Sequence, residues 1–459
     1  MEKSRQIGAD FTEGNVTRIL IRFVTPFLLA SILNSIYNTV DMIIIGKYVG
    51  SVGTVAVSLG GKMLMLFTVL SNGFSAGGQV LIAQEVGARQ KEELNSTIGT
   101  LFSVLAILSV ALGAICILFS RQILTLLNTP QESYSAALSY FVITSIGLPL
   151  VFGYNAVCSV LRGMGDSMNP LKFIAIAAVT NLVLDLVFII GFHMGAVGTA
   201  LATIIGQSVA FFVSLIMLYR RREEFGFDFK WKSFRIDVEK MNIILMIGAP
   251  TAAQSALINV TQLFMISYVN TFGLAQAAAY GIGDKIIVLS SVVTQSLKQA
   301  GGAVAGQNLG ARLPDRAGEV VVSSMKITMT VAVCLAGLSL IFPNALFDLF
   351  TSDPEVLKYS LPFMKVAAVT YILAAMACSY STITVGSGNA KLGFLSGLLD
   401  GVVCRISFCF FFGFYLHMEV VGFFLGSNIA RIAVVLVNGL YYYSGAWRTR
   451  KLLVKQVEG

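Results

Sequence analysis

The chain has 459 residues, of which 56% are hydrophobic and only 12% are Asp, Glu, Lys or Arg. This charged share is roughly half the value of about 25% in soluble domains, so the composition excludes a soluble, a disordered and a disulfide-rich secreted protein. The net charge is +8, but the basic residues are spread over many loops, so we expect no nucleic-acid partner. The sequence predicts an all-α polytopic membrane protein whose solvent is the lipid bilayer.

Twelve apolar stretches are long enough to cross a bilayer, because a membrane-spanning helix needs about 20 residues. A polar connection separates the first six from the last six. We therefore expect an N-terminal six-helix bundle at 1–219, a cytoplasmic linker at 220–241 and a C-terminal six-helix bundle at 242–459. The predicted spans are 18–46, 54–83, 96–120, 133–161, 170–191, 195–219, 242–270, 277–304, 318–345, 357–386, 391–415 and 419–443.

Basic residues are distributed unevenly between the two sets of loops. Most Lys and Arg residues lie in the loops on one side, including the linker, whereas the other side has Lys47, Arg121 and Lys358. Loops rich in Lys and Arg remain in the cytoplasm. We therefore expect a multi-pass protein of the plasma membrane with both termini in the cytoplasm.

The two halves of the sequence repeat one another. The matching pairs, which keep nearly the same separation along the chain, are 84–89 with 307–312, 163–166 with 386–389, Pro26 with Pro250, and His193 with His417. An even number of spans in each half makes both halves enter the membrane in the same direction. The sequence thus predicts two parallel-repeat bundles around a central cleft, an architecture typical of transporters that work by alternating access.

Catalytic motifs do not accompany this architecture. The two histidines, His193 and His417, lie in equivalent short turns, which favours a structural role over a clustered metal site. No phosphate-binding loop for ATP occurs in the sequence. We therefore expect neither an enzyme nor a bound metal or cofactor, and a secondary rather than an ATP-driven transporter.

Acidic side chains inside a membrane are costly, so each one needs a partner or a function. We identify three acids well inside the spans: Asp41, Asp185 and Asp400. Asp41 and Asp185 lie at matched depth, roughly 8–9 Å from the outer ends of spans one and five. Two buried carboxyl groups close together favour the uptake of a proton, and their oxygen atoms would also suit sodium. The pair predicts a cation site for H⁺ or Na⁺, without deciding between them.

Polar side chains at helical spacing surround this pair, and residues three or four apart share a helix face. They are Asn34, Tyr37 and Asn38 on span one, Asn181 on span five, and Thr199, Thr203 and Gln207 on span six. We expect them to line one wet pocket. Alternatively, the same polar stripes would only hold neighbouring helices together.

Three motifs resemble the multidrug and toxic compound extrusion (MATE) family: Val40–Gly46 (VDMIIIG), Leu161–Asp166 (LRGMGD) and Asn181–Asp185 (NLVLD). The resemblance covers the whole chain, including its duplicated halves. It implies a cation-coupled antiporter that exports organic, often cationic and amphiphilic, compounds in exchange for H⁺ or Na⁺. We expect a monomer whose partners are a small-molecule substrate and the bilayer.

The resemblance also implies roles for individual residues. It assigns the cation site of the N-terminal bundle to Asp41, Asn181, Asp185 and Thr203, with Tyr140 and Asn155 as supporting residues. Spans seven and ten carry no acid in their interior. This pattern resembles the DinF-like branch of the family, in which coupling is confined to the N-terminal bundle.

Pro26 lies about two turns into span one, where it removes a backbone hydrogen bond and lets the helix bend. We expect protonation of Asp41 or Asp185 to favour the bent helix, which would collapse the N-terminal cavity and expel the substrate. Alternatively, Pro26 produces a fixed kink.

Three charged residues, Asp400, Arg405 and Arg431, lie inside spans eleven and twelve. Because an i,i+5 pair is poorly placed on an α-helix, we expect Asp400 to pair with Arg431 on the neighbouring span rather than with Arg405. An arginine exposed to the cleft would instead favour anionic substrates. It also leaves open an alternative function, a flippase for lipid-linked saccharides, which would need cationic residues to bind pyrophosphate.

Overall fold

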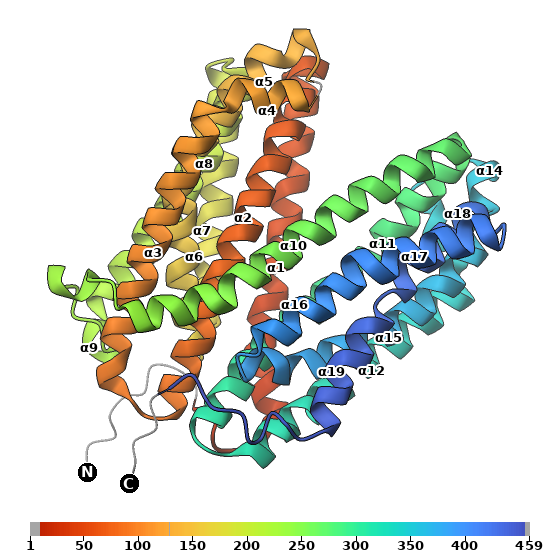
Figure 1. Cartoon of the computed structure of the whole chain (residues 1–459). Coiled ribbons are helices and arrows are strands. Elements are labelled where there is room, and N and C mark those ends of the chain that lie inside the picture. The colour runs from red at the N-terminus through yellow and green to blue at the C-terminus, as the bar shows by residue number, and fades with distance from the viewer. Residues whose placement is uncertain (1–9, 128, 455–459) are drawn as a thin grey trace. The chain divides into compact units, whose positions relative to one another are not determined.

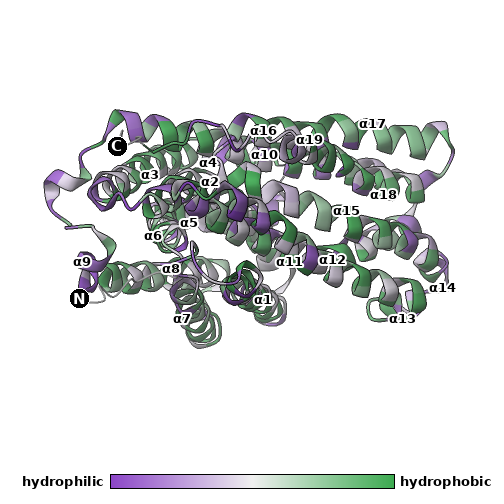
Figure 2. Ribbon diagram, turned by 90° about the horizontal axis from the view of Figure 1, so that it is seen from below, coloured by the Kyte–Doolittle hydropathy of each residue, from purple (hydrophilic) through white to green (hydrophobic). Residues whose placement is uncertain are grey.

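The computed structural model describes residues 10–127 and 129–454, and within these ranges every regular element is a helix (Figure 1). Eleven helices are long and apolar enough to cross a membrane, and one bent pair of helices completes the set of twelve. The all-α fold and the twelve predicted spans are confirmed. Figure 2 shows hydrophobic residues along much of the long helices, whereas the short helix α9 (Arg222–Phe225) is mainly hydrophilic.

The spans of the first half occupy the predicted positions. They are α1 (Val16–Tyr48), α2 (Gly50–Gly87), α3 (Lys91–Leu118), α5 (Gln131–Ile146) with α6 (Leu148–Gly163), α7 (Met168–Asp185) with the π-helix η1 (Leu186–Gly191), and α8 (Gly195–Arg220). Between α5 and α6 the chain bends by 46°. Pro149, the second residue of α6, has no N–H to continue the helix across Gly147. The two short helices of this half are α4 (Ser120–Leu126) and α9 (Arg222–Phe225).

The second half repeats this arrangement. Its spans are α10 (Val238–Val269), α11 (Leu274–Gly310), α12 (Pro314–Ile341), α15 (Ser360–Gly386), then α16 (Ala390–Leu398) with η4 (Leu399–Cys404), α17 (Arg405–Phe410) and η5 (Phe411–Tyr415), and finally α18 (Glu419–Ile429) with α19 (Ile432–Tyr443). The short elements are η2 (Trp231–Phe234), η3 (Asn270–Phe272), α13 (Pro343–Asp348) and α14 (Pro354–Leu357). The eleventh span contains two π-helical stretches, and the twelfth is interrupted next to Arg431.

Equivalent residues of the two halves have nearly the same backbone φ angles, which supports the internal repeat. His193 and His417 both have left-handed φ angles, 54° and 52°, in the turns that follow a π-helix. Arg89 and Arg312, which end the first pair of matching segments, have φ angles of 56° and 58°. Non-glycine residues adopt this conformation rarely, so the halves share their turn geometry as well as their helices.

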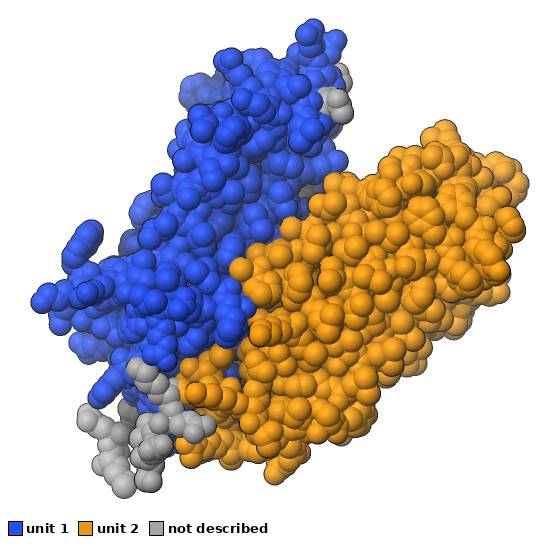
Figure 3. Space-filling view, viewed as in Figure 1, with its two compact units in different colours: residues 1–10, 25–248 blue, residues 11–24, 249–459 orange. Residues whose placement is uncertain are grey.

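The described chain divides into two compact units (Figure 3). Unit 1 contains residues 25–248, and unit 2 contains residues 11–24 together with residues from 249 onward. The division cuts α1 just before Pro26 and α10 just before Pro250. Each repeat therefore has a first helix whose beginning belongs to one unit and whose remainder belongs to the other.

Each unit has its own apolar core. In unit 1, α2 packs against α5 and α6, and α7 packs against α8. Phe141 and Phe152 are among its fully buried side chains. In unit 2, α15 packs against α11 and α12, and rings such as Phe363 and Phe424 meet with their centroids 4.3 Å apart.

The segment that connects the two halves packs against the helices of unit 1. Phe227 and Phe234 stand edge to face, 5.3 Å apart, and both rings lie beside Phe102 of α3. Farther along, Lys240 is buried at the beginning of α10, with its Nζ 2.9 Å from Glu85 Oε1. Together these contacts fix the beginning of α10 to α2 and α3.

Unit 2 holds the segment before α1 in the corresponding way. Phe11 is fully buried, and its carbonyl oxygen accepts hydrogen bonds from Asn308 Nδ2 and Arg316 Nε, each at 3.1 Å. Asn308 is the repeat equivalent of Glu85, because each is the second residue of its matching segment, 307–312 or 84–89. Each unit thus holds the chain that leads into the first helix of the other repeat.

Candidate cation site

The structure brings the two predicted acids of the first half together within unit 1. Asp41 lies on α1 and Asp185 is the last residue of α7, where the chain passes into the π-helix η1. Their carboxyl groups lie close to each other. Asp185 is fully buried and Asp41 is half-buried. The pair is therefore a two-carboxylate site shielded from bulk solvent.

The oxygen atoms of this pair lack donors. Asp41 Oδ1, both carboxylate oxygens of Asp185 and Asn181 Oδ1 are buried, and no donor in the described part of the chain reaches them. Two ionised carboxylates are acceptors only and cannot bond to each other. A buried acceptor without a partner is costly. The arrangement therefore favours a bound proton, which turns one carboxyl group into a donor, or another small cation.

Hydroxyl and amide groups surround the carboxyl pair. Asn181 Nδ2 donates to Thr203 Oγ1 at 3.4 Å, and both residues are buried. The side chains of Tyr37 and Tyr140 lie within hydrogen-bonding reach of the same threonine. Four elements, α1, α5, α7 and α8, thus contribute polar side chains to one site in unit 1.

Two glycines make this close approach possible. A Cβ atom on Gly60 of α2 would lie 2.0 Å from Tyr140 Cδ1, so only glycine lets the tyrosine ring enter at that level. A Cβ atom on Gly206 of α8 would lie 3.2 Å from the Cβ of Asn181. Small residues at helix contacts let neighbouring helices approach closely in membrane proteins, and here they bring Tyr140 and Asn181 to the carboxyl pair.

Among the described residues, no hydrogen bond joins the other predicted pocket residues to the acidic pair. Asn155 is buried and its side-chain amide donates to Val151 of its own helix at 2.9 Å. Thr199 is buried one turn before Thr203 and donates to Gly195 at 3.5 Å. Gln207 is half-buried on α8, and Asn34 is exposed on α1. The side chain of Asn38 lies outside the described residues.

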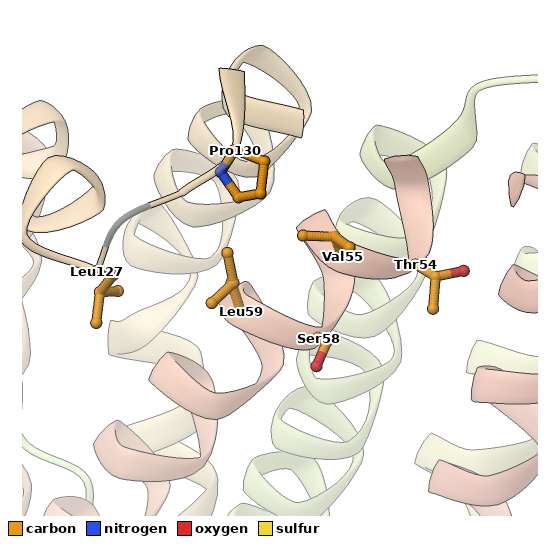
Figure 4. A pocket seen from close by; sticks show the side chains of 6 residues that line it. All are labelled: Thr54, Val55, Ser58, Leu59, Leu127 and Pro130. Carbon is orange, nitrogen blue, oxygen red and sulfur yellow. The ribbon is translucent and has the colours of Figure 1, made fainter. Parts of the chain in front are cut away.

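A small cavity of about 300 Å³ lies at the beginning of α2 (Figure 4). Neither acid lines it, and most of its wall is apolar. It is lined by Thr54, Val55, Ser58, Leu59, Leu127 and Pro130.

The charged residues of the second half pair differently from the prediction. Arg405 Nη2 lies 3.4 Å from Asp400 Oδ1, so Asp400 pairs with Arg405 and not with Arg431. The i,i+5 argument was wrong because residues 399–404 form a π-helix, in which residues five apart come together. Arg405 Nη1 also donates to Ser427 Oγ at 3.3 Å.

A fourth acid, Asp284, lies inside span eight and was not among the predicted site residues. It lies on α11, it is exposed, and its charge interacts with those of Arg431 and Arg405. Its position ten residues after the beginning of α11 is the signal that could have identified it. Unit 2 therefore contains a charged cluster of its own.

Known proteins resemble this chain over nearly its whole length. A model of the MatE family matches residues 26–187 and 250–411, once in each half. The chain is 26% identical over 444 residues to the probable multidrug resistance protein YoeA of Bacillus subtilis (strain 168), which covers 95% of this chain and 96% of that protein. It is 29% identical to the probable multidrug resistance protein YpnP of the same organism, over 97% of this chain and 99% of that protein.

Solved structures share the fold. An outward-facing multidrug resistance MATE family transporter superposes with a TM-score of 0.89, at 20% identity, over 98% of this chain and 100% of that chain. A MATE structure in the bent conformation superposes with a TM-score of 0.87, at 20% identity, over 95% of this chain and 97% of that chain.

Proposed function

Because this chain belongs to the MatE family, whose model matches each of its halves, we propose that Asp41 and Asp185 couple the export of organic cations to the entry of protons. The chain is a multi-pass membrane transporter of the multidrug efflux type and not an enzyme. The observation that carries the proposal is the pair of neighbouring carboxyl groups, of which Asp41 Oδ1 and both Asp185 oxygens are buried without a donor among the described residues. Na⁺ is the second candidate, because Asp41, Asp185, Asn181 and Thr203 offer oxygen atoms that suit a hard cation.

Proton uptake changes the pair in two ways. It converts two facing acceptors into a donor and an acceptor, so the carboxyl groups can bond to each other. It also removes one negative charge, which weakens the attraction for a cationic substrate. A proton that enters through about 100 mV contributes about 2.3 kcal/mol, but a monovalent cation that leaves against the same potential costs as much, so the pH difference alone drives a one-for-one exchange.

Pro26 belongs to the same proposal. It is buried within α1, fifteen residues before Asp41 on the same helix. Loss of the backbone hydrogen bond at a proline lets a helix bend, so proton binding at Asp41 would favour the bent form of α1 and expel the substrate. A Pro26→Ala variant that exports like the wild type would remove this bending step without touching the coupling site.

Uptake of a fluorescent organic cation into everted vesicles, whose outer surface is the cytoplasmic face of the membrane, tests the coupling. The vesicles carry the wild type, Asp41→Asn or Asp185→Asn, and receive either a pH step or a sodium step. We expect the pH step alone to drive wild-type transport and both variants to lose it. Glu355→Gln, which changes an exposed acid in an exposed ion pair, is the matched control.

The outcomes separate the two ions. If the sodium step drives wild-type transport and the pH step does not, the coupling ion at the same residues is Na⁺ and not H⁺. If both aspartate variants pump like the control, the site assignment itself is wrong.

The flippase alternative finds no support, because the matched relatives are multidrug resistance and export proteins and the matched structures are MATE transporters. We further propose a monomer in the plasma membrane with both termini in the cytoplasm. If a reagent that does not cross the membrane labels tags at the termini in intact cells, this orientation is wrong. If light scattering of the purified protein gives the mass of an oligomer, the protein is not a monomer.

A further inference from the structure

The internal repeat places the charged cluster of unit 2 at the positions that form the cation site in unit 1. The offset that aligns Pro26 with Pro250 also aligns Asn181 with Arg405 and Thr203 with Ser427. The contact itself is conserved between the halves. Asn181 Nδ2 donates to Thr203 Oγ1 at 3.4 Å, and Arg405 Nη1 donates to Ser427 Oγ at 3.3 Å. An arginine therefore stands where the cation site has an amide.

The acids of the cation site have neutral counterparts in unit 2. Met265 stands at the equivalent of Asp41 and Cys409 at the equivalent of Asp185, and both are fully buried. Two carboxylates are thus replaced by apolar or weakly polar groups, and a positive charge is added. The polarity of the site is reversed between the halves, so unit 2 does not repeat the cation site.

Arg431 differs from Arg405 in having no partner close by. Arg405 is buried and paired with Asp400 at 3.4 Å. Arg431 is half-buried, and among residues 10–127 and 129–454 its guanidinium has neither a hydrogen bond nor a carboxylate at ion-pair distance. Only longer-range interactions connect it with Asp284 and Asp400. Its hydrogen-bond donors are therefore available to a ligand.

The backbone is interrupted at the same place. α18 ends at Ile429 and α19 begins at Ile432, whereas the equivalent span of unit 1, α8, is continuous. Arg431 is twelve residues from the beginning of α18, which corresponds to about 18 Å, near the middle of a hydrocarbon layer of about 30 Å. Irregular backbone at this depth occurs only where it is buried in protein or lines a water-filled cavity. The beginning of α19 also favours negative charge.

The charges around Arg431 determine which anion fits. By formal charge, Asp284 and Asp400 contribute two negative charges, whereas Arg405, Arg431 and Lys298, whose charge interacts with that of Asp400, contribute three positive ones. The excess is a single positive charge, which suits a monoanion better than pyrophosphate. Arginine binds a carboxylate through two parallel hydrogen bonds.

We propose that Arg431 forms a second ligand site, in unit 2, that binds the carboxylate of a transported zwitterionic amphiphile. This inference rests on the proposed export function and extends its substrate class from organic cations to compounds that carry a carboxylate as well.

Binding of a matched pair of dyes to the purified full-length protein tests the site. The probes are a rhodamine free acid and its methyl ester, which differ only in the carboxylate, and fluorescence anisotropy gives the Kd of each without any ion gradient. The wild type should bind the acid more tightly than the ester. Arg431→Gln, which introduces the side chain found at the equivalent position 207, should raise the Kd of the acid by at least about tenfold and that of the ester by less than about twofold.

A second variant gives a change of opposite sign. Asp284→Asn removes a negative charge near Arg431 and should lower the Kd of the free acid by up to about fivefold. General destabilisation cannot produce such a gain. Equal affinities of the wild type for the two dyes, equal losses for both dyes in Arg431→Gln, or weaker acid binding in Asp284→Asn would each overturn the proposal. Because no ion gradient is present, these results are independent of whether Asp41 and Asp185 couple transport to protons.

Discussion

Replacement of Lys240 by methionine should destabilise unit 1 by about 3–5 kcal/mol. The Nζ atom of Lys240 lies 2.9 Å from Glu85 Oε1, 2.8 Å from Glu93 Oε2 and 2.7 Å from Thr97 Oγ1. Methionine keeps most of the apolar stem and removes the charge. Glu85, which is 2% exposed, would then retain a single donor, the hydroxyl of Thr97 at 2.7 Å. Its Oε2 already lacks a partner among the described residues.

The magnitude follows from burial. The side chain of Glu93 is 34% exposed, so its pair with Lys240 contributes at most about 1 kcal/mol. The loss comes mainly from the buried charge left on Glu85. For a unit of this size, 3–5 kcal/mol corresponds to a fall of about 6–20 °C in the thermal unfolding midpoint.

Thermal unfolding of the purified protein in detergent measures this effect. Arg221→Met is the matched control, because the Arg221–Glu224 pair has a similar length, 2.9 Å, but its side chains are 35% and 36% exposed. The control should change stability by no more than about 1 kcal/mol. Addition of Glu85→Gln to Lys240→Met should restore part of the stability. A Lys240→Met midpoint no lower than that of the control, or a double variant whose losses simply add, would refute the reasoning.

Two further predictions concern unit 1. Gly60→Ala should lower the free energy of unfolding by about 1–3 kcal/mol, because the added Cβ would overlap the ring of Tyr140. Gly61→Ala is the control and should be neutral, since nothing lies within 4 Å of its added Cβ. Equal unfolding midpoints of the two variants would contradict this prediction. Asp237 caps α10 by accepting hydrogen bonds from the N–H groups of Glu239 and Lys240 at 2.9 and 3.3 Å, so Asp237→Ala should cost about 0.5–2 kcal/mol. Partial burial raises the pKa of Asp237, but these two N–H groups and the Ser96 hydroxyl lower it more, to a value below the ordinary 3.8. The stabilisation is therefore present above that ordinary value and is lost as the pH falls through the folded value, so the stability difference between the wild type and Asp237→Ala should shrink in acid; a difference that stays constant down to about pH 3 would contradict the cap.

The membrane spans could be predicted from the sequence because the bilayer imposes a length and an apolar composition on each of them. The bend within the fourth span was not predicted, although Pro149 was a visible signal. A run of apolar residues shows how long a span is, but it does not show where a proline removes a backbone N–H and lets the helix bend. The packing of the linker onto α3 was also not predicted, because Phe227 and Phe234 lie in a segment rich in charged residues.

The acidic pair could be predicted because helical rise fixes depth, and the matched depths of Asp41 and Asp185 follow from counting residues. Depth does not determine which faces meet. Asn155, which was expected near the site, donates its side-chain amide to its own helix, and Tyr140 reaches the site because Gly60 leaves it room. The resemblance suggested Tyr140, but the space that admits it appears only in three dimensions.

The charged residues of the second half were predicted least well. The separation of Asp400 and Arg405 by five positions excludes a pair on an α-helix but favours one on a π-helix. The sequence alone does not show which of the two helix types, α or π, these residues form. Asp284 was overlooked inside an apolar span, and its significance depends on two arginines that lie far away in the sequence, on spans eleven and twelve.

The exchange of first-helix segments between the units has a consequence for biosynthesis. Residues 11–24 leave the ribosome before the rest of unit 2, and Asn308 and Arg316, which hold Phe11, are made only after the whole of unit 1. At about 5–20 residues per second, the nascent N-terminal segment waits for tens of seconds before its docking site exists. Unit 1, by contrast, is complete once residue 248 has been synthesised. The second unit therefore matures last, when it binds a segment that was synthesised before most of unit 1.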